Sequence, residues 1–173
     1  LLSAGRVLGD QAAHDRGVDL TFHLWTNGFS RADGPCHRLR NEGVIPGGLV
    51  DAAELSQALL DAHLATRDAI WLARARVVFE HAFRAYRHPR GGLSDIEVSL
   101  AAPGRLRQAR RPFRANAIMA ENADRIAAQT DSDLYRTSAD QLFQGLTEVD
   151  AEPALFASRY ALALARRRTA VRV

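Results

Sequence analysis

The sequence predicts an all-α fold of antiparallel helical hairpins, with a small β excursion near residues 18–30. Apolar residues recur every three or four positions over most of the chain, which is the period of helices that bury one face. Segments containing Pro or Gly follow several of these stripes, and short polar turns at residues 66–68 and 130–132 separate the others. A pair of stripes recurs after a shift of 64 residues, which indicates a repeated hairpin.

The N-terminal part is predicted to form a degenerate version of that hairpin. A short helix is expected to end near His14. Residues 18–24 then alternate between apolar and polar side chains, which favours a strand, and Asn27-Gly28 offers a tight turn after it. This stretch is the predicted β excursion.

Helical periodicity dominates the rest of the chain. Asp51 lies at the start of one stripe, and Gly91-Gly92 follows the end of the next. Residues 93–113 show no period. The expected helices cover residues 50–65, 68–86, 114–128, 132–146 and 153–168.

The shift of 64 residues matches two of these hairpins position by position. Thr66 falls on Thr130 at the turn, and Trp71 falls on Tyr135 in the return helix. The other matched pairs are Leu55 and Met119, Leu59 and Ala123, Ala62 and Ile126, Ile70 and Leu134, Ala75 and Ala139, Val78 and Leu142, and Phe79 and Phe143. Because such units bury their apolar faces against neighbours, we expect a single domain over residues 1–173. Its units are residues 1–48, residues 49–112, and residues 113–150 followed by the final helix at 153–168.

Composition narrows the class of protein. With 173 residues, 47% of them hydrophobic, the chain can bury one core, and it has no stretch apolar enough for a membrane span. The formal net charge of +3 comes from arginine alone, since the sequence contains no lysine. Cys36 is the only cysteine, which excludes an intrachain disulfide and fits a reducing, cytoplasmic location. No nucleotide-binding glycine motif is present, so no cofactor is expected.

Several short motifs resemble one family in their order and spacing. They are Gly48-Leu49-Val50-Asp51-Ala52-Ala53, Ala58-Leu59-Leu60-Asp61-Ala62, Ala65-Thr66-Arg67-Asp68, Trp71-Leu72, Gly91-Gly92-Leu93-Ser94-Asp95, Arg111-Pro112-Phe113, Asn116-Ala117 and Leu134-Tyr135-Arg136 with Ala139. They are similar to the C-terminal, six-hairpin-glycosidase-like region of thioredoxin-domain-containing proteins. The likeness spans about residues 12–165.

The resemblance implies part of an α/α toroid, a fold shared with glycoside hydrolases and N-acylglucosamine epimerases. The chain has material for about half of the six hairpins of a toroid, which would form an arc. Ala115 stands where the family has an acid, and the thioredoxin-like domain lies outside this sequence. We therefore expect a non-catalytic scaffold or interaction subunit. The alternative is a carbohydrate-active enzyme, similar to a glycoside hydrolase or sugar epimerase, or a fragment of one.

Four carboxylates are candidates for sugar chemistry, which needs two carboxyl groups across one bond. Asp95 and Glu97 follow the glycine pair, and with Glu121 they could face a toroid mouth; the alternative is an ordinary polar surface. Asp51 is the fourth candidate. Its spacing from Glu54 favours a capping box, with Asp51 as the N-cap residue and Glu54 three positions later.

Other polar residues suggest binding sites. Cys36, His37 and His23 could hold a soft metal, but they lack paired-ligand spacing, so no metal is expected. The expected interaction surface consists of arginines: Arg105, Arg107, Arg110, Arg111, Arg114, Arg166, Arg167 and Arg168. These could contact acidic proteins or lipid headgroups; the alternative is an ordinary solvated surface. Nucleic acid is not favoured, because no aromatic residues are interleaved with them.

Apolar residues at both ends of the chain predict an uncovered edge. They are Leu1-Leu2 and Val7-Leu8 at the front, and Phe156, Tyr160 and Leu164 at the back. Terminal units of helical arrays normally carry a polar outer face. We therefore expect a partner protein, a second copy or the remainder of a longer parent chain to cover an apolar edge of the toroid arc.

Overall fold

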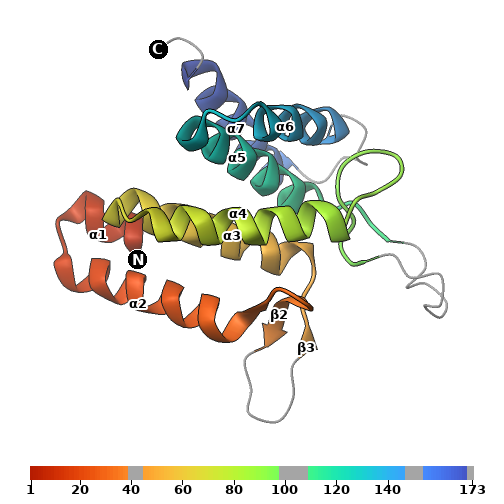
Figure 1. Ribbon diagram of the computed structural model, residues 1–173. Helices are drawn as coiled ribbons and strands as arrows, with labels where there is room; N and C mark the ends of the chain where they lie inside the picture. The colour runs from red at the N-terminus through yellow and green to blue at the C-terminus, as the bar shows by residue number, and fades with distance from the viewer. Residues whose placement is uncertain (39–44, 98–108, 147–153, 171–173) are drawn as a thin grey trace. The chain divides into compact units, whose positions relative to one another are not determined.

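The computed structural model describes residues 1–38, 45–97, 109–146 and 154–170. Within them the chain is mostly helical with three short strands, which confirms the predicted all-α fold with a small β excursion (Figure 1). The elements are α1 (Leu2–Leu8), α2 (Gln11–Gly28), β1 (Phe29–Ser30), β2 (Gly34–Arg38), β3 (Ile45–Pro46), α3 (Leu49–Thr66), α4 (Ala69–Ala85), α5 (Phe113–Thr130), α6 (Asp133–Leu146) and α7 (Ala154–Ala170). None of the described helices combines the length and hydropathy that a membrane crossing needs.

The chain divides into two compact units, Leu1–Ala82 (the first unit) and Phe83–Val173 (the second unit). The boundary falls inside α4, whose helix continues through it. In the first unit, α1 folds back on α2, and both contact α3. In the second unit, α5 contacts both α6 and α7.

Helix α2 replaces the predicted strand, so the strand expected over residues 18–24 is wrong. The helix begins after Asp10, whose carboxylate accepts a hydrogen bond from Ala13 N–H at 3.0 Å. Its buried residues are small: Gly17, Thr21 and Gly28. They allow close approach, since a Cβ added to Gly17 would lie 2.9 Å from Leu2 Cγ. The large apolar residues therefore do not mark the buried face, and their alternation misled the prediction.

The β structure begins where α2 ends, and the strands pair antiparallel in the order β1-β2-β3. The paired residues are Phe29 with Pro35 and Ser30 with Gly34, then Cys36 with Pro46 and Arg38 with Ile45. The turn between β1 and β2 is not the predicted Asn27-Gly28, which ends α2. Instead, the Ser30 hydroxyl accepts hydrogen bonds from the N–H groups of Ala32 and Asp33, each at 3.1 Å.

The first hairpin consists of α3 and α4. Gly48 is the N-cap residue of α3, and the Asp51 carboxylate accepts the Gly48 N–H at 2.8 Å. Asp51 therefore has the position that the sequence analysis gave to Glu54, and its assignment as N-cap is wrong. The helix starts earlier because Leu49 is completely buried and already helical. Glycine has no side chain, so Gly48 offered no capping signal.

The second hairpin, α5 and α6, repeats the geometry of the first. A shift of 64 residues carries α3 onto α5 and the start of α4 onto the start of α6. Arg67 and Asp131 end the two first helices in the left-handed conformation, with φ of 60° and 50°. Of the matched apolar pairs, Ile70 and Leu134 are exposed in both hairpins, and all the others are buried in both. The core positions of the predicted repeat are thus equivalent.

Candidate functional site

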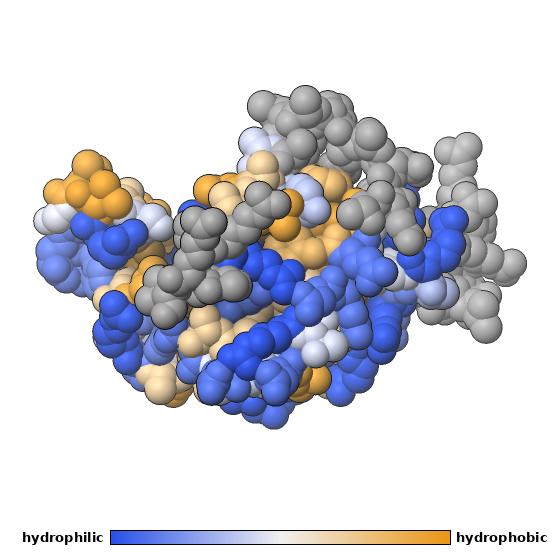
Figure 2. All heavy atoms as spheres, turned by 90° about the horizontal axis from the view of Figure 1, so that it is seen from above, coloured by the Kyte–Doolittle hydropathy of each residue, from blue (hydrophilic) through white to orange (hydrophobic). Residues whose placement is uncertain are grey.

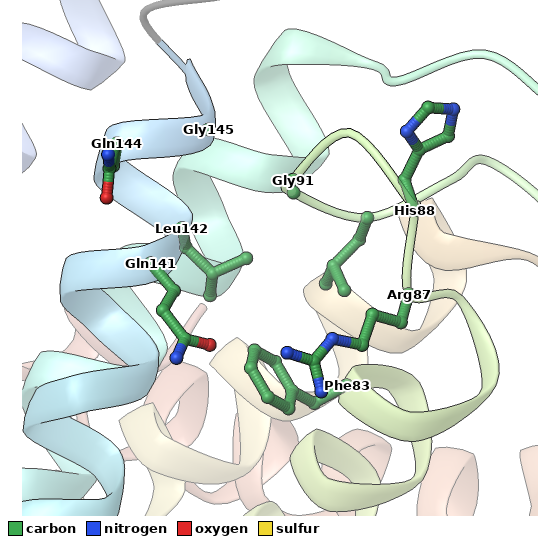
Figure 3. Close-up of a pocket in the computed structure, with 10 residues that line it drawn as sticks. Phe83, Arg87, His88, Gly91, Gln141, Leu142, Gln144 and Gly145 are labelled. Atoms are coloured by element: carbon green, nitrogen blue, oxygen red, sulfur yellow. The ribbon is translucent and has the colours of Figure 1, made fainter.

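A pocket of about 270 Å³ opens in the second unit, between the loop that follows α4 and the C-terminal half of α6 (Figure 3). Its lining residues are Phe83, Arg87, His88, Gly91, Gly92, Leu93, Gln141, Leu142, Gln144 and Gly145. The polar groups among them are a guanidinium, an imidazole and two amides. No carboxylate is among these lining residues.

The loop that forms one wall is fixed by its own backbone. Arg87 and Leu93 form an antiparallel bridge, and His88 N–H donates to Gly92 O at 3.0 Å. Gly91 and Gly92 have φ of 86° and 70°, a conformation that glycine adopts without steric cost. The glycine pair, which the sequence indicated as a helix stop, therefore also shapes the pocket wall.

Two side chains near the start of α5 hold this loop in place. Arg111 Nη1 donates to the carbonyl oxygens of Arg90 at 3.2 Å and Gly91 at 3.3 Å. Asn116 Oδ1 accepts from Leu93 N–H at 2.7 Å, and Asn116 Nδ2 donates to Leu93 O at 2.9 Å. The loop that forms this wall is thus held by hydrogen bonds from two side chains that do not line the pocket.

Across the pocket, α6 approaches the loop through a glycine. A Cβ added to Gly145 would lie 2.7 Å from Gly92 N, so a larger residue would push the two walls apart. The Arg87 and Gln141 side chains extend toward one another from opposite walls (Figure 3). The Arg87 guanidinium also lies over the Phe83 ring, 5.9 Å from its centroid. The pocket therefore combines an oriented cation with an amide.

Two guanidinium groups, those of Arg90 and Arg111, act on His88 in the loop. Burial lowers the pKa of His88, and the guanidinium charges of Arg111 and Arg90 lower it further. Arg90 N–H donates to His88 Nδ1 at 3.1 Å, which requires that nitrogen to be unprotonated. Near neutral pH the imidazole is therefore uncharged and carries its proton on Nε2.

Three of the four candidate catalytic carboxylates, Asp51, Asp95 and Glu97, lie outside the pocket. Asp51 Oδ1 lies 3.0 Å from His37 Nδ1, and its other oxygen caps α3. Asp95 Oδ1 accepts from Arg110 N–H at 2.9 Å, which ties the loop to the segment before α5. Glu97 is exposed at the end of a described segment. None of the three lines the pocket.

Glu121, the fourth candidate, is buried on α5 and forms an ion pair with Arg166 of α7. Beside it, Arg167 lies 3.7 Å from Asp124 Oδ2 and also pairs with Asp140 of α6. Burial raises the pKa of Asp124, and the Arg167 charge opposes that rise. Arg166 and Arg167, two arginines of the expected interaction surface, therefore pair α7 with carboxylates of α5 and α6.

The remaining arginine candidates divide between described and undescribed parts. Arg110 and Arg114 are exposed near the start of α5, and Arg111 braces the pocket loop. Arg105, Arg107 and the side chain of Arg168 lie outside the described residues.

Two of the candidate metal ligands, Cys36 and His37, are adjacent on β2, whereas His23 is on α2. Cys36 Sγ, on β2, lies 3.7 Å from the carbonyl oxygen of Asn27. His37 pairs with Asp51, and His23 is on the exposed side of α2. Among the described residues, no group of three or more His, Cys, Asp or Glu side chains is arranged to hold a metal ion.

In the first unit, an arginine lies among aromatic rings. The Arg74 guanidinium is 5.4 Å from the Phe22 ring centroid, 5.6 Å from that of Trp25 and 4.9 Å from that of Trp71. Phe22 is nevertheless half exposed. Figure 2 shows hydrophobic side chains reaching one face of the molecule in several groups among hydrophilic ones.

The predicted apolar edges differ between the two ends. At the front, Leu1, Val7 and Leu8 are exposed, as expected, while Leu2 is buried. At the back, Tyr160 contacts the rings of Phe113 and Phe143, and Leu164 is half-buried. The side chain of Phe156 lies outside the described residues. The exposed edge is therefore better defined in the first unit.

Comparison with models of known protein families finds no match, and comparison with curated proteins finds none either.

Sequence reasoning missed the polar residues of the pocket. Arg87 and Gln141 are separated by more than fifty residues and belong to no motif. The glycine pair was the available signal, because two adjacent glycines after a helix indicate a special backbone shape. The partner wall on α6 could not be inferred without the fold.

Proposed function

We propose that the chain is a non-catalytic helical-hairpin module that binds another polypeptide through the apolar face of α1 and α2. The observation that carries this proposal is the exposure of large apolar side chains on these two helices. The exposed fractions are 71% for Val7 and 77% for Leu8 on α1, and 39% for Leu20 and 41% for Leu24 on α2. Single exposed leucines are ordinary, but several on two adjacent helices favour an interaction surface.

The pattern of α2 supports this surface. Gly17 and Thr21 face the interior, whereas Leu20 and Leu24, one helical turn apart, lie beside that buried stripe and are partly exposed. The apolar arc of α2 is thus wider than the face that the fold covers. In helical arrays the next hairpin covers such an arc, so the proposed occupant is an apolar helical face of another polypeptide, from a partner or from a longer parent chain.

The carboxylates support a non-catalytic role over a carbohydrate-active enzyme. Glycosidic bond cleavage needs two carboxyl groups facing one substrate. Asp51 and Asp95 bind backbone N–H groups, and Glu121 is in an ion pair. These contacts give the three carboxylates structural roles. Such roles support the proposal that the chain is a scaffold subunit resembling an arc of a six-hairpin toroid.

Size-exclusion chromatography with light scattering on the isolated chain tests the proposal. We expect a mass above 19.0 kDa or binding of a hydrophobic dye. Replacing Leu20 and Leu24 together by Ser should reduce both signals. Leu134→Ser is the matched control, since Leu134 is 67% exposed but belongs to α6 of the second unit and not to α1 or α2. A stable 19 kDa monomer that binds no dye would overturn the proposal.

A further inference from the structure

We infer that the pocket between the 87–93 loop and α6 is a binding site for a small oxyanion, a carboxylate or phosphate group held by Arg87 and Gln141. This site is independent of the proposed apolar interaction face. It rests on three features: an unpaired cation in a concave site, positive charge around it, and a braced wall.

Arg87 and Gln141 are available to a ligand. Among the described residues, Arg87 has the Phe83 ring as its neighbour and no ion pair, and Gln141 makes no side-chain hydrogen bond. A guanidinium presents parallel N–H donors that match two oxygens of a carboxylate or phosphate, and an amide adds a further donor. Phe83 restricts the orientation of the guanidinium, so less conformational entropy is lost when an anion binds.

The surrounding charge favours an anion over a cation or a neutral ligand. Arg90 is part of the loop and Arg111 donates hydrogen bonds to it; the pKa of the neighbouring His88 is lowered first by burial and then by the charges of Arg111 and Arg90. The same potential that disfavours a proton on His88 attracts negative charge. The carbonyl ends of α4 and α6 point to the same region, but each supplies only about half a negative charge, against three full guanidinium charges.

The wall itself is suited to a permanent site. Asn116 and Arg111 hydrogen-bond the loop, and Gly145 lets α6 lie directly against it. The pocket is therefore formed before any ligand arrives. Its volume of about 270 Å³ admits a group of several heavy atoms, such as phosphate, a sugar phosphate or an acidic side chain.

The experiment is an NMR titration of the full chain with sodium phosphate or sodium acetate, at constant ionic strength maintained with chloride. We expect saturable shifts of the Gln141 side-chain amide and the His88 ring, and a rise in the pKa of His88 as an anion offsets the nearby cations. Tighter binding of acetate would identify a carboxylate ligand, and tighter binding of phosphate would identify a phosphate ester.

Variants separate a specific site from general attraction. Arg87→Gln should weaken binding by about tenfold or more, because a charge-assisted hydrogen bond is lost. Arg84→Gln, an exposed arginine one turn earlier on α4, should change it by less than about twofold. Equal losses in both variants, or shifts that do not saturate with either anion, would overturn the inference.

Discussion

The two hairpins share their turns and buried positions but differ on the other face of their first helix. In α3 that face carries Asp51 and Glu54, which are half-buried. In α5 the positions 64 residues later are Ala115 and Ile118, each only 1% exposed. The neighbours account for the difference, because α7 contacts α5, whereas α1 and α2 contact α3. Closure of the hairpin fixes one face of each repeat, and the next element along determines the other.

The largest effect is expected from truncating the aromatic residue at the start of each return helix. Trp71→Ala and Tyr135→Ala should each lower the free energy of unfolding by about 3–5 kcal/mol, since both side chains are buried. Urea unfolding followed by circular dichroism measures this. Ile70→Ala and Leu134→Ala, the exposed neighbours, are matched controls that should change it by less than about 0.5 kcal/mol.

Fluorescence sharpens the same comparison. Both tryptophans, Trp25 and Trp71, belong to the first unit, so their emission follows that unit. If Tyr135→Ala shifts the circular dichroism transition but not the fluorescence transition, the two units unfold separately. If Trp71→Ala costs no more than Ile70→Ala, the equivalence of the hairpins is wrong.

A smaller loss of stability is expected from filling the close contact between Gly145 of α6, in the second hairpin, and the backbone of Gly92. Gly145→Ala should destabilise the protein by about 1–3 kcal/mol, because the added Cβ would lie 2.7 Å from Gly92 N. The equivalent position in the first hairpin is His81, which shows that this glycine is not a feature of the repeat. Thr137→Ala, on the exposed side of α6, is the control. Stabilisation by Gly145→Ala, as at an ordinary helix position, would contradict the close contact.

Replacing Asp51 tests how the start of α3 differs from the start of α5. Asp51→Ala should cost about 0.5–2 kcal/mol, because the Gly48 N–H loses its acceptor, and it should leave polypeptide binding intact. The second hairpin already has Ala115 at this position. Thermal unfolding together with a binding assay checks both expectations. Loss of an activity at unchanged melting temperature would instead indicate a catalytic carboxylate.

Arg67 and Asp131, the residues with left-handed backbone that follow α3 and α5, should show similar changes in stability when they are replaced by glycine. Arg67→Gly and Asp131→Gly should each stabilise by up to about 1 kcal/mol, since glycine removes the cost of positive φ. The gain should be smaller at Asp131, which also pairs with Arg136. Differential scanning calorimetry of both variants would reveal this order. Destabilisation at Arg67 would mean that its side chain has a further role.

Asp124 should give the smallest effect, visible only in the pH dependence of stability. Its folded pKa is raised by burial, so the folded state binds this proton more tightly than the unfolded state. Stability should therefore fall as pH rises from the ordinary aspartate pKa through the raised one. Asp124→Asn should flatten that slope in urea unfolding over acidic pH. In α3 the equivalent residue is Leu60, where no such slope can arise.

The sequence was sufficient for the hairpins and insufficient for the pocket, for physical reasons. Leu59 lies at helical spacing from the other buried residues of α3, and Val78 from those of α4, so the burial of each could be predicted from the period of its own helix. Helix α2 was missed because glycine and threonine form its buried stripe. The pocket depends on Arg87 and Gln141 being brought together by tertiary structure, which no local pattern encodes. Likewise, the ion pair between Arg166 and Glu121 joins two distant helices and could not be predicted from the sequence.

Helix α4 contributes residues to both units, so the stability of one unit can affect the other. Trp71, near its start, is in the core of the first unit, while Phe83, near its end, lines the pocket of the second. A ligand that binds only the folded pocket stabilises it by about 2.7 kcal/mol at a concentration one hundred times its Kd. Since one continuous helix belongs to both units, that linkage free energy would also oppose fraying in the first unit. Occupancy of the pocket would then slow amide hydrogen exchange along the distant half of α4.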